Sequence, residues 1–226
     1  MFLTLILSSL LTFVELNCEN LFDTRHDSLK NDVEFLPEGS YHWTPYRYWH
    51  KVNHLGQEIV AQSNSIPDFV AMCEVENDSV MFDLTKRSLL RNAGYEYVMT
   101  SSPDERGIDV ALLYQPASFA LLHSHSIRIK PLPDTRPTRD ILYASGLIIT
   151  GDTLHVFVVH APSRRGGEQV SRPYRLQVAS QLAEAVDSVY AISRDAKIII
   201  AGDFNDYADS PALQYLYEHH LINISA

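Results

Sequence analysis

Polar side chains follow four apolar runs of the sequence, each at the point where the run ends. They are Asn17, Glu74, His160 and Asp203. A single carboxylate at a strand end is usually a turn or capping residue. Four such positions with complementary chemistry favour a shared site, because a rigid sheet commonly holds catalytic groups at the ends of its strands.

The chemistry that these residue types support is metal-assisted attack on a phosphate ester. Carboxylate and amide oxygens from Asn17, Glu74, Asp203 and Asn205 are hard ligands, suited to Mg²⁺, Mn²⁺ or Ca²⁺ rather than zinc. A divalent ion can neutralise a phosphate and steady the leaving oxygen. A histidine such as His160 can stabilise the charge that develops on a phosphoryl oxygen.

Arginines follow His160 closely along the chain. The stretch Arg164–Gly167 reads RRGG, and its glycines would let the backbone approach an anion that the arginines bind. A solvated surface turn explains the same stretch equally well. Arg172 and Arg175 come beside the first turn of an expected helix, where cations oppose the helix dipole unless an anion or carboxylate lies between.

Short apolar runs rich in β-branched residues predict the strands that would position these groups. The expected strands are Thr12–Leu16, Asp68–Cys73, Tyr95–Thr100, Asp109–Tyr114, Ala144–Thr150, Leu154–Val159 and Lys197–Ala201. Gly151-Asp152 predicts a hairpin turn between two of them. Strands mixed with helical crossovers favour an α+β fold of packed layers over a purely parallel sheet.

Apolar residues at helical spacing predict helices over Tyr46–Gln62 and Pro173–Ile192, and a shorter one over Pro211–His219. Ser171 is the expected N-cap of the second helix, with Pro173 in its first turn.

Composition is that of a folded protein of one large domain or two small ones. The chain has 226 residues, 46% hydrophobic and 20% charged, with a net charge of −10. This acidity argues against a broad basic surface for nucleic acid, but not against an enzyme that meets phosphate through a cation. Cys18 and Cys73 are expected to be buried, and they support neither a disulfide framework nor a cysteine zinc site.

Residues 1–13 form an apolar segment without charged side chains. The segment is too short to span a bilayer as a helix and matches the apolar part of a secretory signal, although no Lys or Arg precedes it. We expect it to be signal-like and the protein to be extracytoplasmic, periplasmic or secreted. A buried first strand in a cytoplasmic protein is the alternative.

Five motifs follow one another along nearly the whole chain. They are NCENLFD from Asn17, IPDFVAMCEVEN around Glu74, RGIDVALLY around Asp109, VVHAPSRRGG around His160 and IIIAGDFND around Asp203. Together they resemble the motifs of the endonuclease/exonuclease/phosphatase superfamily, whose members share the fold of DNase I. The resemblance implies a four-layer α/β/β/α sandwich.

The resemblance also implies where a cation and the attacking water would lie. Asn17 and Glu74 would hold Mg²⁺, or Mn²⁺ or Ca²⁺, with Glu19 close by. Asp203 would orient and activate the water that attacks phosphorus.

Charge stabilisation and phosphate binding would fall to a second group of residues. By the resemblance, Asn205 and His160 would stabilise the pentacoordinate phosphorus, and Asp109 would orient His160. Arg139, in TRPTRD, falls where related enzymes carry an arginine near the phosphate. Arg164 is the second expected phosphate ligand.

The resemblance fails at the end of the chain. The superfamily closes with a serine-aspartate-histidine motif on a late strand, whereas this sequence ends soon after Asp203, and His219 and His220 fall in an expected helix. We therefore expect residues 14–226 to form an incomplete domain without its C-terminal strands, with an exposed sheet edge. We also expect this polypeptide to be nearly inactive.

Two functions stay open at this point. One is a metal-dependent phosphoesterase, acting on a phosphodiester or phosphomonoester in nucleic acid, a lipid head group or a small molecule, with no stable protein partner. The other is a binding module that keeps the fold without the reaction. A glycosidase with Glu74 and Asp203 as its carboxylate pair would leave Asn17, Asn205 and His160 unexplained.

Overall fold

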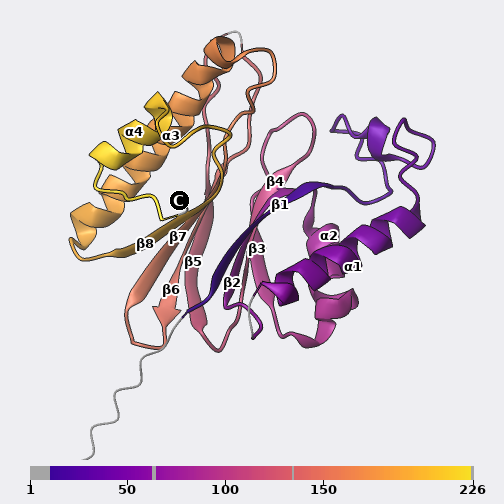
Figure 1. Ribbon diagram of the computed structural model, residues 1–226, viewed down its shortest axis with the longest axis horizontal. Coiled ribbons are helices and arrows are strands. Elements are labelled where there is room, and N and C mark those ends of the chain that lie inside the picture. Colours follow the sequence, from indigo (N-terminus) through magenta and orange to yellow (C-terminus); the bar gives the residue numbers. More distant parts are fainter. Residues whose placement is uncertain (1–10, 63–64, 134, 225–226) are drawn as a thin grey trace, which may run out of the picture.

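The computed structural model describes residues 11–62, 65–133 and 135–224, which form two four-stranded sheets packed face to face (Figure 1). The first sheet contains, in order across it, β1 (Phe13–Leu21), β2 (Phe69–Val75), β4 (Asp109–Tyr114) and β3 (Glu96–Met99). The second contains β5 (Phe119–Ile127), β6 (Ile141–Ile148), β7 (Thr153–His160) and β8 (Lys197–Asp203).

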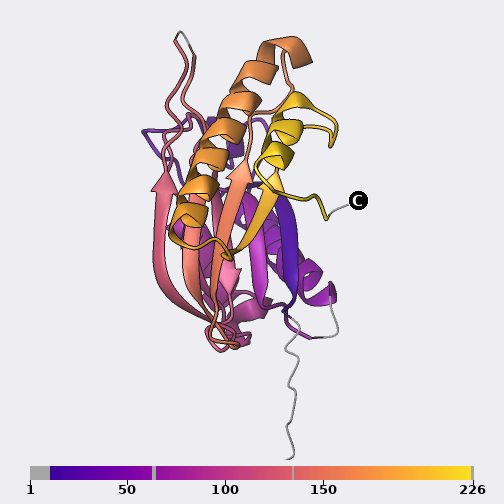
Figure 2. The same cartoon turned by 90° about the vertical axis from the view of Figure 1, so that its left-hand side faces the viewer.

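Helices cover the outer face of each sheet. The first sheet carries α1 (Pro45–Ala61) and α2 (Asp78–Phe82), and the second carries α3 (Glu168–Ile192) and α4 (Pro211–Glu218) (Figures 1 and 2). Short helical turns lie at Val33–Phe35, Asp83–Arg87 and Leu89–Asn92. The predicted α+β class and the α/β/β/α layers are thus confirmed. No helix within the described ranges has the length and apolar character needed to cross a membrane.

The central strands are buried because both of their faces are covered. Along β2, Phe69, Ala71 and Cys73 pack into the layer between the sheets. Val70 and Met72 alternate with them and pack under α1. A strand covered on both sides reads as a continuous apolar run, which is why β2 and β4 were predictable from sequence.

The start of α3 differs from the prediction. The helix begins at Glu168, with Gly167 as N-cap, so Pro173 lies inside it and Ser171 is not the cap. Gly166 and Gly167 adopt φ of 86° and 110°, which lets the chain turn into the helix several residues early. The Ser171 hydroxyl instead donates a hydrogen bond to the Gly167 carbonyl at 2.9 Å.

The strand β5 was not predicted. Its pairing with β6 shifts register between Leu121 and His123, so one extra residue interrupts the alternation that marks a strand in sequence. The hairpin at Gly151-Asp152 is present, since β6 and β7 pair antiparallel on either side of it.

The strands β1 and β8 lie at the same edge of the sandwich and contact each other (Figure 2). β1 runs parallel to β2, and β8 runs parallel to β7. The carboxyl ends of all four strands therefore meet at one end of the molecule. Of the signal-like segment 1–13, residues 1–10 lie outside the described residues.

Candidate active site

A hydrogen bond between the two sheets joins the predicted site residues Asn17 and Asp203. The Asn17 amide Nδ2 donates to Asp203 Oδ2 at 3.1 Å. Parallel pairing places His160 directly beside Asp203, and Asn17 beside Cys73, the residue that precedes Glu74. The His160 Nε2 lies 3.8 Å from Glu74 Oε1. The structure thus brings Asn17, Glu74, His160 and Asp203 together.

Irregular backbone orients the side chains of Glu74 and Asn205. Glu74 has a φ of 62° and sits where the β2–β4 register shifts between Cys73 and Val75. Asn205 has a φ of 50° just after β8. Non-glycine residues in the left-handed region cost on the order of 1–3 kcal/mol each and cluster at functional sites. The backbone conformation of Glu74 and Asn205 therefore favours a functional role for these two residues.

The loop after β8 is held by its own side chains. The Asn205 backbone N–H donates to Asp203 Oδ1 at 2.7 Å, and its Nδ2 donates to the Ala161 carbonyl at 3.0 Å. Both Asp203 oxygens thus accept a hydrogen bond, which fixes the orientation of the carboxylate.

Arg139 shares the Ala161 carbonyl with Asn205, donating from Nη2 at 2.8 Å. Its Nη1 lies 3.4 Å from Asp104 Oδ2, and both side chains are buried. Arg139 therefore places a fixed positive charge beneath the loop that follows β7.

His160 is a neutral imidazole in this setting. Burial, followed by the positive charges of Arg139 and Arg106, lowers the pKa of His160 to about 2. Its Nδ1 is buried and has no hydrogen-bond partner among the residues that the structure describes. Asp109, which was expected to orient His160, has other partners, because its Oδ1 accepts from the Thr100 hydroxyl at 2.6 Å and from the Ser102 N–H at 2.9 Å.

Two other predicted residues lie at the margin of this cluster. The Glu19 N–H donates to Asn17 Oδ1 at 2.9 Å, while its exposed side chain lines an adjacent pocket. Arg164 is half-buried and places its guanidinium 4.2 Å from the centre of the Tyr207 ring. Arg164 would have to leave this ring to bind a phosphate at the cluster.

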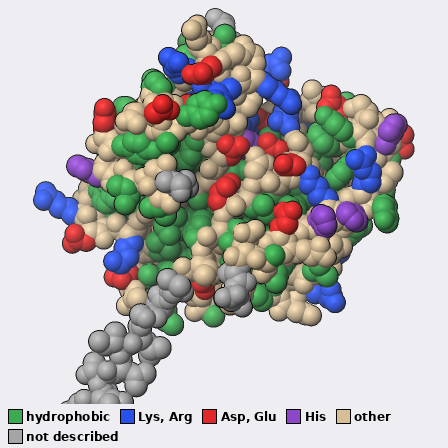
Figure 3. All heavy atoms as spheres, viewed as in Figure 1, with side chains coloured by type: hydrophobic (Ala, Val, Ile, Leu, Met, Phe, Trp, Pro, Cys, Tyr) green, Lys and Arg blue, Asp and Glu red, His purple; other side chains and the backbone are tan. Residues whose placement is uncertain are grey.

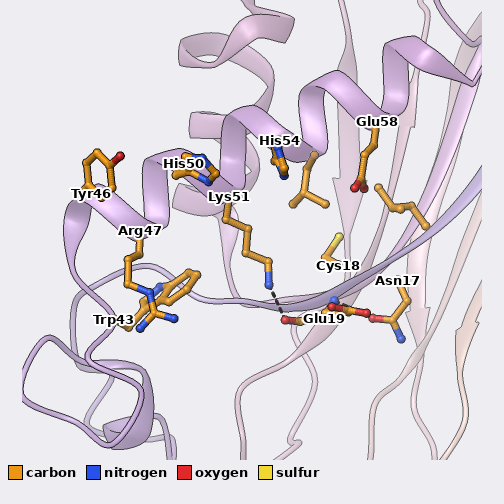
Figure 4. Close-up of a pocket in the computed structure, with 12 residues that line it drawn as sticks. Asn17, Cys18, Glu19, Trp43, Tyr46, Arg47, His50, Lys51, His54 and Glu58 are labelled. Atoms are coloured by element: carbon orange, nitrogen blue, oxygen red, sulfur yellow. Dashed lines mark hydrogen bonds between the residues drawn. The ribbon is translucent and has the colours of Figure 1, made fainter.

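The adjacent pocket, of about 630 Å³, lies between α1 and the end of β1 (Figure 4). The Lys51 ammonium reaches across it and donates to the carbonyls of Glu19 and Asn20. Both residues adopt positive φ, 51° and 66°, within the β1 irregularity that follows Asn17. Burial lowers the pKa of Lys51.

Arg106 holds the same irregularity from the other side, because its guanidinium donates to the Asn20 side-chain oxygen. Sequence reasoning missed both Lys51 and Arg106. A single cation in a helix or a loop carries no local signal of the distant strand end that it contacts.

The oxygen donors of the cluster fit a hard divalent cation. Among the described residues, no three His, Cys, Asp or Glu side chains converge as a metal site. Mg²⁺ commonly needs only one or two carboxylates, with water and substrate phosphate completing its shell. Glu74 would supply the carboxylate to such an ion and Asn17 an amide oxygen.

Figure 3 shows acidic side chains gathered along the middle of this face, between the half that carries α3 and α4 and the half that carries α1. Lys and Arg side chains lie close to them. Acidic side chains on this surface can attract a cation, and the neighbouring Lys and Arg side chains can attract an anion such as a phosphate.

Residues 12–220 match the model of the Endonuclease/Exonuclease/phosphatase family. The chain therefore belongs to this family. No curated protein sequence matches it.

Solved structures share the fold at low sequence identity. The catalytic domain of human Nocturnin with a bound sulfate anion is 20% identical, with a TM-score of 0.59 over 74% of this chain and 61% of its own. Humanized D. rerio TDP2 is 20% identical, with a TM-score of 0.58 over 89% and 65%. The mannosyl-6-phosphatase of Bacteroides thetaiotaomicron is 16% identical, with a TM-score of 0.63 over 92% and 70%. The chain thus spans less than two thirds of the first two proteins.

Proposed function

We propose that this protein is a Mg²⁺-dependent phosphoesterase that hydrolyses a phosphate ester with an activated water. The observation that carries the proposal is the meeting of Asn17, Glu74, His160 and Asp203 at one end of the sandwich. Asn17 and Glu74 would hold the cation, which when bound neutralises charge on the phosphate.

Asp203 is the residue that orients and deprotonates the attacking water. The hydrogen bonds from Asn17 and Asn205 fix the direction of its carboxylate. A positioned general base contributes about 10²–10⁴ to a rate.

His160 and Asn205 stabilise the charge that builds on the phosphoryl oxygens. A neutral imidazole carries one N–H, and the position of Nε2 opposite the Glu74 carboxylate favours that nitrogen as the proton carrier. His160 can then donate this hydrogen bond to a phosphoryl oxygen, while the buried Arg139 adds a nearby positive charge.

The similar structures support phosphate esters as the substrate class of this chain, but they do not indicate a particular ester. They include a mannosyl-6-phosphatase and a TDP2 complexed with a single-stranded DNA product. We propose the same broad substrate class here, without choosing between monoesters and diesters.

The test is a panel of phosphomonoesters and phosphodiesters, assayed on the 226-residue chain with Mg²⁺ and with EDTA. We expect weak hydrolysis, in line with the low activity expected from the sequence, that EDTA abolishes and that Glu74→Gln lowers further, by at least about 10²-fold. Glu58→Gln, on α1 in the adjacent pocket, is the matched control and should keep the wild-type rate. Turnover that survives both EDTA and Glu74→Gln would refute the proposal. Binding of the esters without turnover would favour a binding module.

A further inference from the structure

Two histidines on the edge strand β5 face each other with their ring nitrogens in contact. The His125 Nδ1 and the His123 Nε2 lie 3.0 Å apart, and the ring centres are separated by 5.0 Å. β5 lies at the opposite edge of its sheet from β8, so this pair is separate from the candidate active site.

A β-bulge places both histidines on the outer face of the sheet. Before it, Phe119 and Leu121 point into the layer between the sheets, whereas Ile127 after it packs on the outer face, although all three are odd-numbered. The extra residue between Leu121 and His123 reverses the alternation. His123 and His125 therefore lie on the outer face, and bulges commonly re-aim side chains in this way at functional positions.

Aromatic neighbours on the outer face hold the pair in place. The Tyr143 ring lies 5.0 Å from the His125 ring and 6.3 Å from the His123 ring. The Tyr143 hydroxyl is itself 2.8 Å from His155 Nδ1, on the next strand. Packing against a fixed ring limits the rotamers of the two histidines, which lowers the entropic cost of binding a ligand between them.

The nitrogen separation is close to that of a metal chelate. Zn–N bonds of about 2.0–2.1 Å with a tetrahedral angle place two ligand nitrogens roughly 3.3 Å apart. The pair needs to open by only a few tenths of an ångström to admit an ion. Imidazole nitrogens suit Zn²⁺, Ni²⁺ and Cu²⁺ and are poor ligands for Mg²⁺.

We propose that His123 and His125 form a two-histidine site for a transition-metal ion of the Zn²⁺ class, on the outer face of β5, with water completing its coordination. The site is independent of the proposed phosphoesterase function, and its failure would leave that function untouched.

Calorimetric titration with Zn²⁺, in excess Mg²⁺ to fill oxygen-ligand sites, tests the proposal on the whole chain. We expect one site, weakened at least tenfold by His123→Ala or His125→Ala. The matched control is the double variant His50→Ala/His54→Ala, which removes the other histidine pair, on α1, with rings 5.0 Å apart. That control should bind as the wild type does.

Cu²⁺ electron paramagnetic resonance gives a second measurement that does not depend on affinity. We expect coupling to two imidazole nitrogens in the wild type and its loss in His123→Gln/His125→Gln, which keeps polar side chains on this strand. Loss of the Zn²⁺ site in the α1 variant, or its retention in the β5 variants, would overturn the proposal. A wild-type chain that binds no Zn²⁺ would overturn it as well.

Discussion

At the scale of single residues, chemical type was easier to predict than local partners. Asn17, Glu74, His160 and Asp203 were identified from polar positions at strand ends, and the structure places them in one cluster. Asp109, whose role beside His160 was implied by the family resemblance, has other partners in the structure. Its carboxylate serves Thr100 and Ser102, because a buried acceptor takes the donors nearest to it.

His160→Gln should change both the rate and the acid stability. The rate should fall by about 10²–10³ if His160 donates to a developing oxyanion. In the folded state the pKa of His160 is about 2, whereas in the unfolded chain it is about 6.5. The unfolded state thus binds more protons between these values, so the wild type loses stability as pH falls from about 6.5.

Urea unfolding of both proteins at pH 7.5 and pH 5 measures this effect. The variant should lose less stability than the wild type between the two pH values. Equal losses would mean that His160 is not held neutral in the folded protein.

At the scale of elements, regular strands and helices were predictable, and the irregular ones were not. β2 and β4 show long apolar runs, but the bulge in β5 breaks the alternation on which strand prediction depends. The start of α3 was misplaced because Gly166 and Gly167 supply a turn that competes with the Ser171-Pro173 signal.

Lys51→Met should loosen the end of β1 without unfolding α1. Lys51 holds the carbonyls of Glu19 and Asn20, both of which have strained backbone, and the Glu19 N–H fixes the Asn17 side chain. We expect Mg²⁺ affinity to fall by about 10–100-fold, as for residues that orient metal ligands.

Calorimetry with Mg²⁺ measures this loss, and Lys51→Arg should restore part of it. Arg47→Met is the control, because Arg47 lies on the same helix but donates to the carbonyls of Tyr41 and His42. Unchanged Mg²⁺ affinity in Lys51→Met would show that Lys51 does not position Asn17.

Glu76, one residue past β2, should make stability fall as pH rises. Burial raises its pKa to about 8, partly offset by the Asp23 N–H, which donates to Glu76 Oε2 at 2.6 Å. The folded state therefore holds a proton that the unfolded chain releases above its pKa of about 4.3. Stability is fully present below that value and is lost as pH rises towards 8.

Glu76→Gln keeps the acceptor oxygen and removes the titration. Relative to the wild type, it should gain on the order of 1–3 kcal/mol between pH 5 and pH 8.5, as measured by urea unfolding. A constant difference between the two proteins across this range would contradict the assignment.

At the scale of the whole molecule, the candidate active site depends on the contact between β1 and β8, which joins the edges of the two sheets. Asn17 and Asp203 are 186 positions apart and are joined by a hydrogen bond. Hydrophobic periodicity predicted the strands, the helices and an α+β fold of packed layers, whereas the four-layer order was implied by the family resemblance. Polar residue types at strand ends favoured a shared site, but the roles of its members were implied by the resemblance to a known family, because local patterns do not encode contacts at such separation.

The most direct test of the central claim is anomalous diffraction from crystals of this chain soaked in Mn²⁺. We predict one strong peak at the ends of β1 and β2, with Glu74 and Asn17 oxygens within about 2.0–2.3 Å of the ion. The peak should be lost in Glu74→Gln crystals soaked in the same way. A peak away from Glu74, or an unchanged peak in the variant, would contradict the proposed catalytic centre.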